Sequence, residues 1–276
     1  ASISSSPACC GLRARAWLES VRNTLSASGL TLNQLSDRSG YSKTRISELL
    51  RGNGYYPPWE ITFSVVRALG LPAPPMRRLW SAAAREANKE VGWIDRCIDQ
   101  VLLEPEDPPI AYQGFTETMR TPYTDYARAF LLTEHRARWV VAETCDILWL
   151  RWADATTSSN VRHYAWRLLR SRVMARAPRH ADGHPDLRAA AFSTQHGHTT
   201  DADGTFCEID HMLDLFDAIT RLPQGQMDVA VLRYLCGMDH STISGILGLN
   251  PAITRAMDHH ARAALENLLR TQNSLE

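Results

Sequence analysis

The chain has 276 residues, of which 44% are hydrophobic, and equal numbers of basic and acidic residues give it a formal net charge of zero. This length and composition suffice for about two or three small hydrophobic cores. No run of about 18 apolar residues is present, and the first residues lack the basic start and apolar middle of a signal peptide. We therefore expect a cytoplasmic protein that has no membrane segment.

The zero total hides a strong segregation of charge along the chain. Residues 1–90 hold twelve Lys and Arg against six Asp and Glu, and residues 155–181 hold six Arg and no acid. Residues 91–154 and 205–276 are acidic instead. Because a protein that binds a polyanion needs only a local positive field, the two basic segments are candidates for contact with nucleic acid.

Nothing in the sequence indicates catalysis or a metal. The six cysteines show no CxxC pairing with histidines and no disulfide-framework spacing, so we expect reduced thiols. Four histidines fall irregularly in one polar stretch, which is typical of a solvated loop rather than of a metal site. Phosphate-binding loops, nucleophile elbows and zinc-protease motifs are absent from the sequence. We predict a protein that is not an enzyme and that binds no cofactor or metal.

Nearly all periodic segments have apolar residues three and four positions apart, which is the helical spacing, and strand alternation is scarce. Breaks rich in Pro and Gly separate these segments. The sequence therefore predicts an all-α fold in three modules. The expected divisions are a disordered tail (1–11), a helix-turn-helix module (12–92), a helical module (110–180), a flexible linker (181–204) and a second helix-turn-helix module (205–270).

The stretch 30–52, LTLNQLSDRSGYSKTRISELLRG, carries the clearest local pattern. It predicts a short helix over 32–38, a turn at 39–41 and a second helix whose N-cap is Ser42. Gly40 falls where a left-handed backbone costs least, which lets the second helix leave at a steep angle. The stretch thus predicts a helix-turn-helix corner.

Leu35, Ile46 and Leu49 are spaced so that they face a common core. This leaves the start of the second helix exposed, and that part of the motif enters the major groove in helix-turn-helix proteins. We expect Ser42, Lys43, Thr44, Arg45 and Ser47 to face DNA, with Arg38 and Arg51 on phosphates.

These residues resemble the XRE (phage-repressor-like) family over roughly residues 12–90. The resemblance is carried by Leu30-Thr31, Leu35-Ser36, Gly40, Ser42, Ile46-Ser47, Leu49, Arg51-Gly52 and the following YYPPWEITFSVVRALG. It implies a five-helix domain that binds double-stranded DNA sequence-specifically, and a homodimer. One departure is Leu32, where the family often carries a glutamine.

Residues 205–270 resemble region 4 of the extracytoplasmic-function (ECF) type of sigma factor. The resemblance is carried by Leu222-Pro223, Leu232-Arg233-Tyr234, Gly237, Ile243, Ile246-Leu247-Gly248, Pro251, Arg255, His259, Ala261-Arg262 and Leu265. It implies a second reading helix, on which Arg255, His259 and Arg262 are candidate DNA contacts.

This second helix departs from the family pattern of an apolar residue, an arginine, an apolar residue and an arginine. The chain has Thr254, Met257, Asp258 and His260 at those positions, so two cations are lost and an acid is gained. Each lost phosphate contact weakens binding, and we expect the acid to repel the DNA backbone. Impaired or altered DNA reading is our interpretation, and the alternatives are intact reading and a chance resemblance.

Residues 110–180 resemble region 2 of the same family. Trp139 to Thr144, Trp149, Trp152 and 165–167 carry this resemblance. It implies a basic, aromatic strip that contacts promoter DNA through Arg162, Arg167, Arg170 and Arg172, with Trp166 stacking on unpaired bases. The alternative is an amphipathic helix whose Trp166 lies in the core. Trp139 and Ala142 stand where the family has polar residues for RNA polymerase, which suggests that this helix packs inside the protein.

These observations together favour a bacterial transcription regulator associated with the nucleoid. Its expected partners are double-stranded DNA and a second copy of the chain, with RNA polymerase or a sigma factor as a further candidate. One alternative is an atypical ECF-type sigma factor that recruits RNA polymerase. A second alternative is an interaction scaffold whose sigma-like surfaces bind only proteins.

Overall fold

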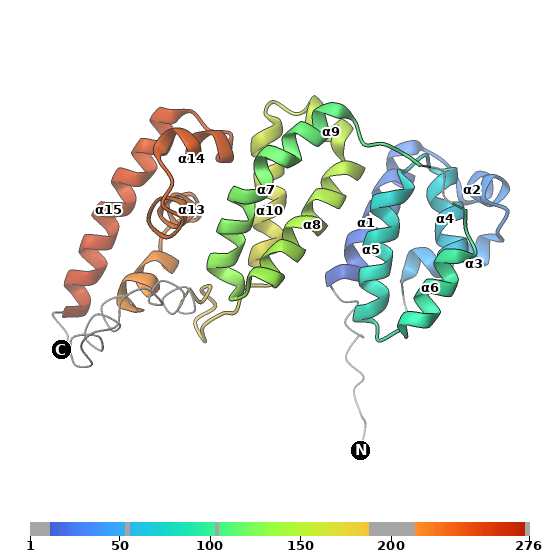
Figure 1. The fold of residues 1–276 in the computed structure, drawn as a ribbon, viewed down its shortest axis with the longest axis horizontal. Helices are drawn as coiled ribbons and strands as arrows, with labels where there is room; N and C mark the ends of the chain where they lie inside the picture. The colour runs from blue at the N-terminus through green and yellow to red at the C-terminus, as the bar shows by residue number, and fades with distance from the viewer. Residues whose placement is uncertain (1–11, 53–55, 103–104, 188–212, 274–276) are drawn as a thin grey trace, which may run out of the picture. The chain divides into compact units, whose positions relative to one another are not determined.

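The computed structural model describes residues 12–52, 56–102, 105–187 and 213–273 (Figure 1). Within these ranges every regular element is a helix, apart from an isolated antiparallel bridge between Arg179 and Pro185. The all-α expectation is therefore confirmed. The expected tail and residues 188–204 of the expected linker lie outside the described residues.

The chain divides into two compact units. The N-terminal unit comprises the residues up to 113 together with 145–153, and the C-terminal unit comprises 114–144 and the residues from 154 onward. The last turns of α8 (Glu134–Leu150) therefore belong with the N-terminal unit.

The N-terminal unit is a compact group of short helices. Its helix α1 packs on α5, α2 packs on α3 and α4, and α4 packs on α5 and α6. The helices are α1 (Leu12–Ser28), α2 (Leu32–Ser39), α3 (Lys43–Arg51), α4 (Trp59–Ala68), α5 (Ala73–Glu86) and α6 (Val91–Asp99).

Aromatic rings fill the middle of this unit. Trp80 is fully buried, and its ring centroid lies 5.5 Å from that of Trp59, 5.6 Å from that of Tyr56 and 5.8 Å from that of Trp93. The Tyr56 hydroxyl donates to the Trp80 carbonyl at 2.6 Å, so its polar end is satisfied inside the core. Because α6 contributes Trp93 to this cluster, the unit continues past residue 92.

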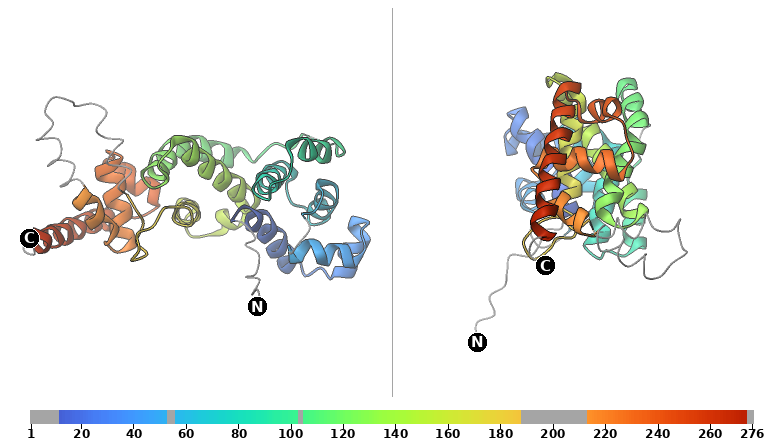
Figure 2. Two further views of the ribbon diagram at one scale, coloured as in Figure 1. Left: turned by 90° about the horizontal axis from the view of Figure 1, so that it is seen from below. Right: turned by 90° about the vertical axis from the view of Figure 1, so that its left-hand side faces the viewer.

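The C-terminal unit contains longer helices, and the long α15 packs across α13 and α14 (Figure 2). Residues 213–220 are also helical. The remaining elements are α7 (Ile110–Leu131), α9 (Trp152–Thr157), α10 (Val161–Met174), α13 (Gln224–Ala230), the π-helical turn η2 (Val231–Leu235), α14 (His240–Leu247) and α15 (Pro251–Asn273).

A buried carboxylate joins three helices of this unit that are far apart in the sequence. Asp228 on α13 accepts a hydrogen bond of 2.8 Å from the Tyr126 hydroxyl on α7. The Arg170 Nε on α10 donates to both of its oxygens, at 2.9 and 2.7 Å. The Asp228 side chain is 5% exposed and that of Arg170 is 17% exposed. The charges are therefore matched inside the protein rather than by water.

Burial dominates the acid–base behaviour of this group. It raises the pKa of the Asp228 carboxyl above its usual value, although Arg170 and Tyr126 oppose the rise. Burial, followed by the nearby Asp228, raises the pKa of the Tyr126 hydroxyl well above its usual value. Tyr126 therefore stays protonated and acts as the donor.

A second buried pair joins α8 to the residues that follow α10. The Arg176 guanidinium donates to both Glu143 oxygens, at 3.0 and 2.7 Å, and the two side chains are 10% and 3% exposed. The same guanidinium lies 5.2 Å from the ring centroid of Trp139, which adds a cation–π contact. Glu143 therefore lies in the packed face of α8. Of the two residues from which the sequence suggested packing of this helix, Trp139 is half-buried and Ala142 is exposed.

The first turn of α10 caps the end of α14. The Asn160 amide donates to the Gly248 carbonyl at 3.1 Å, and the Arg162 guanidinium donates to the Gly245 carbonyl at 3.2 Å. Gly248 has φ of +64°, and a Cβ there would collide with the backbone nitrogen of His163, so the close approach requires glycine. The carbonyls that end α14 are thus satisfied by α10.

We expect Asp228→Ala to lower the free energy of unfolding by about 3–5 kcal/mol, because it leaves the Arg170 charge buried without its partner. Replacing both members, Asp228→Leu with Arg170→Met, should cost less than Asp228→Ala alone. Urea unfolding followed by circular dichroism measures both effects.

The matched control is Arg138→Ala, which breaks the exposed pair between Arg138 and Glu134 one helical turn apart. It should cost less than about 1 kcal/mol. Equal losses for Asp228→Ala and Arg138→Ala would contradict a structural role for the buried pair.

Candidate nucleic-acid interface

The corner between α2 and α3 has the local geometry that the sequence predicts. Gly40 ends α2 with φ of +73°, and its N–H donates to the Ser36 carbonyl at 3.0 Å. Ser42 is the N-cap of α3, and its hydroxyl accepts from the Arg45 N–H. Thr31 and Gln34 form a reciprocal capping box at the start of α2. Both helix starts are therefore fixed by their own side chains.

The inner face of the corner is apolar and closed. Leu35 and Ile46 are fully buried, and Leu49 is 4% exposed, as the spacing of these residues predicts. Their burial fixes which side of α3 faces outward.

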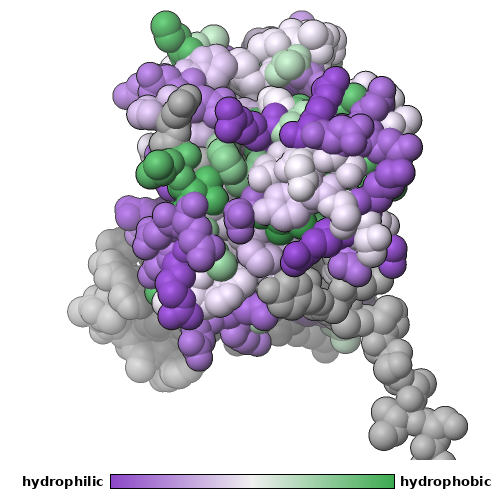
Figure 3. All heavy atoms as spheres, turned by 90° about the vertical axis from the view of Figure 1, so that its right-hand side faces the viewer, coloured by the Kyte–Doolittle hydropathy of each residue, from purple (hydrophilic) through white to green (hydrophobic). Residues whose placement is uncertain are grey.

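The outward side carries most of the predicted DNA contacts. The corner is part of the surface in Figure 3, where hydrophilic residues predominate. Ser47 is half-buried, and its hydroxyl accepts from Arg51 at 3.0 Å, so it helps to hold Arg51. The exposed residues are Arg38, Ser42, Lys43, Thr44, Arg45 and Arg51.

Arg22 on α1 holds the far end of α3, which the sequence did not reveal. Its Nε donates to the Leu50 carbonyl at 2.6 Å, and a second guanidinium nitrogen donates to the Arg51 carbonyl at 2.9 Å. A cation at these carbonyls also complements the helix dipole. Because Arg22 lies 28 residues from Leu50, no local pattern announces the contact.

A side-chain hydrogen bond also stabilises the turn before α3. The Ser36 hydroxyl donates to the Tyr41 carbonyl at 2.7 Å. Partial burial and the neighbouring Glu60 of α4 raise the pKa of the Tyr41 hydroxyl. With Arg22 at the other end, α3 is held at both termini.

Part of the expected second DNA interface on α10 is used inside the C-terminal unit, while its role in binding DNA stays a prediction. Trp166 is 3% exposed, and its ring lies 4.6 Å from that of Tyr126, so it cannot stack on a base in this structure. Arg170 is paired with Asp228, and Arg162 is bonded to the α14 carbonyl of Gly245. Of the other predicted contacts, Arg167 is exposed and Arg172 is half-buried.

Arg255, His259 and Arg262 lie exposed on α15, in keeping with their spacing of four and three residues. Thr254 is fully buried and Asp258 is 4% exposed, so these two positions face inward. The Asp258 carboxylate therefore lies inside the unit rather than on its surface, and the expectation that it repels DNA stays a prediction.

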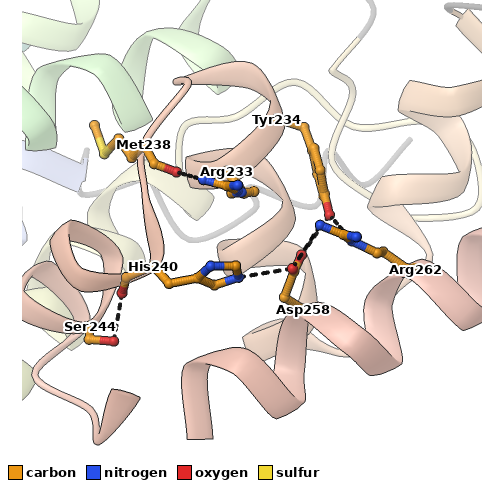
Figure 4. Close-up of polar contacts among 7 residues, drawn as sticks. All are labelled: Arg233, Tyr234, Met238, His240, Ser244, Asp258 and Arg262. Carbon is orange, nitrogen blue, oxygen red and sulfur yellow. Dashed lines mark hydrogen bonds and ion pairs between the residues drawn. The ribbon is translucent and has the colours of Figure 1, made fainter. Parts of the chain in front are cut away.

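Three donors converge on Asp258 (Figure 4). The Tyr234 hydroxyl on η2 lies 2.6 Å from one oxygen, and His240 Nε2, at the start of α14, lies 2.9 Å from the other. Arg262, one turn further along α15, lies 3.2 Å from that second oxygen. Its Nε also donates to the Tyr234 hydroxyl at 2.7 Å. The cluster joins η2, α14 and α15.

These contacts set the charge state of Asp258. Burial by itself raises the pKa of the carboxyl, but the hydrogen bonds from Tyr234 and His240 and the charge of Arg262 outweigh it, so the pKa lies below its usual value. Tyr234, followed by Asp258, raises the pKa of the Arg262 guanidinium. Arg262 is thus partly engaged in holding Asp258.

Neither a membrane span nor a metal centre is present among the described residues. No described helix combines the length and apolar character needed to cross a bilayer. In the same part of the chain, His, Cys, Asp and Glu form no group of three or more that could hold a metal ion.

No protein-family model matches the chain, and no curated protein matches it. What the chain does must therefore be inferred from its own residues and their geometry.

We expect Asp258→Asn to destabilise the C-terminal unit by about 1–3 kcal/mol at pH 7, because an amide pairs poorly with Arg262 and His240. A carboxyl whose pKa is lowered on folding stabilises the folded state fully at pH values above its pKa in the unfolded chain. That stabilisation is lost as the pH falls through its lower pKa in the folded state. The difference between the native protein and Asp258→Asn should therefore shrink below about pH 4.

Urea unfolding at several pH values measures this difference. The exposed Asp214 provides a matched control, since Asp214→Asn makes the same chemical change in solvent. A gap between the native protein and Asp258→Asn that is constant from pH 7 to pH 3 would contradict the electrostatic role of Asp258.

Proposed function

We propose that the protein is a transcription regulator that binds double-stranded DNA sequence-specifically through the start of α3. The observation that carries the proposal is the exposed run Lys43, Thr44 and Arg45 at the N-terminus of a helix whose opposite face is closed and whose two ends are fixed. An α-helix with such a face fits the major groove of B-DNA, where arginine and lysine hydrogen-bond to guanine.

The distribution of charge also supports the proposal that the exposed side of α3 contacts DNA. Residues 1–90 carry twice as many basic as acidic residues, and Arg38 and Arg51 are exposed at the ends of α2 and α3. Cations at the margins of a reading helix bind phosphates and set its register on the duplex. Lys43 to Arg45 would then supply the base contacts.

The contacts inside the C-terminal unit support a function for this unit other than independent recognition of DNA. Arg170 and Arg176 are paired with buried carboxylates, and Trp166 is in the core. The alternative in which this unit recognises a promoter as an ECF-type sigma factor does is therefore less well supported. We propose that the unit mediates homodimerisation or contact with RNA polymerase or a sigma factor, since one small helix-turn-helix domain buries little surface on DNA.

We expect the full chain to enrich a defined motif from a library of random duplexes, and Arg45→Ala to weaken binding to that motif by about 1–3 kcal/mol while relaxing the preference at one position. Fluorescence anisotropy on matched and mutated duplexes at fixed salt measures both effects.

The control is Arg85→Ala, which removes an exposed arginine from α5 in the same unit. Its effect on affinity should be small and independent of sequence. If Arg45→Ala weakens binding to the motif and binding to random DNA equally, Arg45 contacts phosphate rather than a base. If the native chain enriches no motif, the proposed function is refuted.

A further inference from the structure

An acidic side chain lies on the same exposed side of α3 as the basic residues. Glu48 is exposed, three residues after Arg45 and three before Arg51. Both spacings allow an ion pair along the helix, yet across the described residues Glu48 forms none, and Arg51 donates to Ser47 instead. The carboxylate is therefore free to meet a ligand from outside.

The backbone around Glu48 is rigidly held. The Glu48 carbonyl accepts from the N–H of Gly52 at 3.2 Å, and Arg22 binds the carbonyls of Leu50 and Arg51. When α3 docks on DNA, the helix cannot rotate Glu48 away without breaking these bonds. A carboxylate carried at this position is repelled by phosphates and is stabilised where it accepts a hydrogen bond from a donor in the groove.

Few base edges in the major groove offer a hydrogen-bond donor that suits the carboxylate of Glu48. In the major groove, guanine and the carbonyl of thymine present hydrogen-bond acceptors, which repel a carboxylate. Adenine presents its amino group as a donor, but directly beside it lies the acceptor N7. Cytosine presents its N4 amino group as a donor, and Glu or Asp is its expected partner. The carboxylate of Glu48 therefore fits cytosine best.

We propose that Glu48 is a specificity-determining residue that selects a cytosine in the operator and disfavours other bases at that position. This inference rests on the proposed function of α3. The axial rise of a helix puts Glu48 about 4.5 Å from Arg45. Because base pairs are stacked about 3.4 Å apart, the cytosine should lie roughly one base pair from the base that Arg45 reads.

The inference predicts a change of base preference for Glu48→Gln. Glutamine recognises adenine through N6 and N7, so the selected base should shift from cytosine toward adenine, with a change in discrimination of about tenfold. Glu48→Ala should lose the preference without gaining another. Both variants should bind nonspecific DNA more tightly than the native chain, because a negative charge has been removed from the interface.

The test is motif selection from random duplexes by the full chain and by each variant, followed by affinities on duplexes that differ at one base pair. Glu90→Gln, at the exposed start of α6, removes the same charge elsewhere in the unit and should leave the motif unchanged. Unchanged thermal unfolding of the Glu48 variants, as an exposed side chain predicts, excludes a merely structural effect.

The outcomes separate the two proposals. If the native chain enriches a motif and Glu48→Gln enriches the same motif with equal discrimination, the role of Glu48 is overturned while DNA binding by α3 stands. If the native chain enriches no motif, both proposals fail.

Discussion

The buried carboxylate of Asp228 constrains the whole C-terminal unit. An ionised group in the interior must be matched by partners that are themselves fixed, and Asp228 finds them in Tyr126 on α7 and Arg170 on α10. The three residues lie as far as 102 positions apart in the sequence. The interaction therefore sets the packing of α7, α10 and α13, and with it the orientation of α10 toward the end of α14.

The two basic segments of the chain differ in what their charges contact. Residues 155–181 hold six arginines and no acid, but Arg162, Arg170 and Arg176 bind carbonyls and carboxylates of their own unit. The cations at the α2–α3 corner have a different setting, because the closed apolar face under α3 leaves Lys43 and Arg45 pointing to solvent. Charge density along the chain therefore does not show which cations are engaged within the protein, whereas the partners of each charge do.

The parts of the structure that were predictable are those fixed by neighbouring residues. Gly40, Ser42 and the spacing of Leu35 and Ile46 act within one or two turns, so the corner and its caps could be read from the sequence. The partners of Asp228, the Arg22 clamp on α3 and the burial of Asp258 could not be predicted, because each depends on residues brought together only by the fold. The same holds for Trp166, whose aromatic ring suits a core and a base stack equally well until its neighbours are known.

The central proposal is that the start of α3 lies in the major groove of DNA that the protein binds. Ultraviolet cross-linking of the full chain to a duplex carrying its selected motif, followed by mass spectrometry of the cross-linked peptides, tests it most directly. Cross-links concentrated on residues 42–51 are the predicted result. Cross-links confined to α10 or α15, with none on α3, would contradict it.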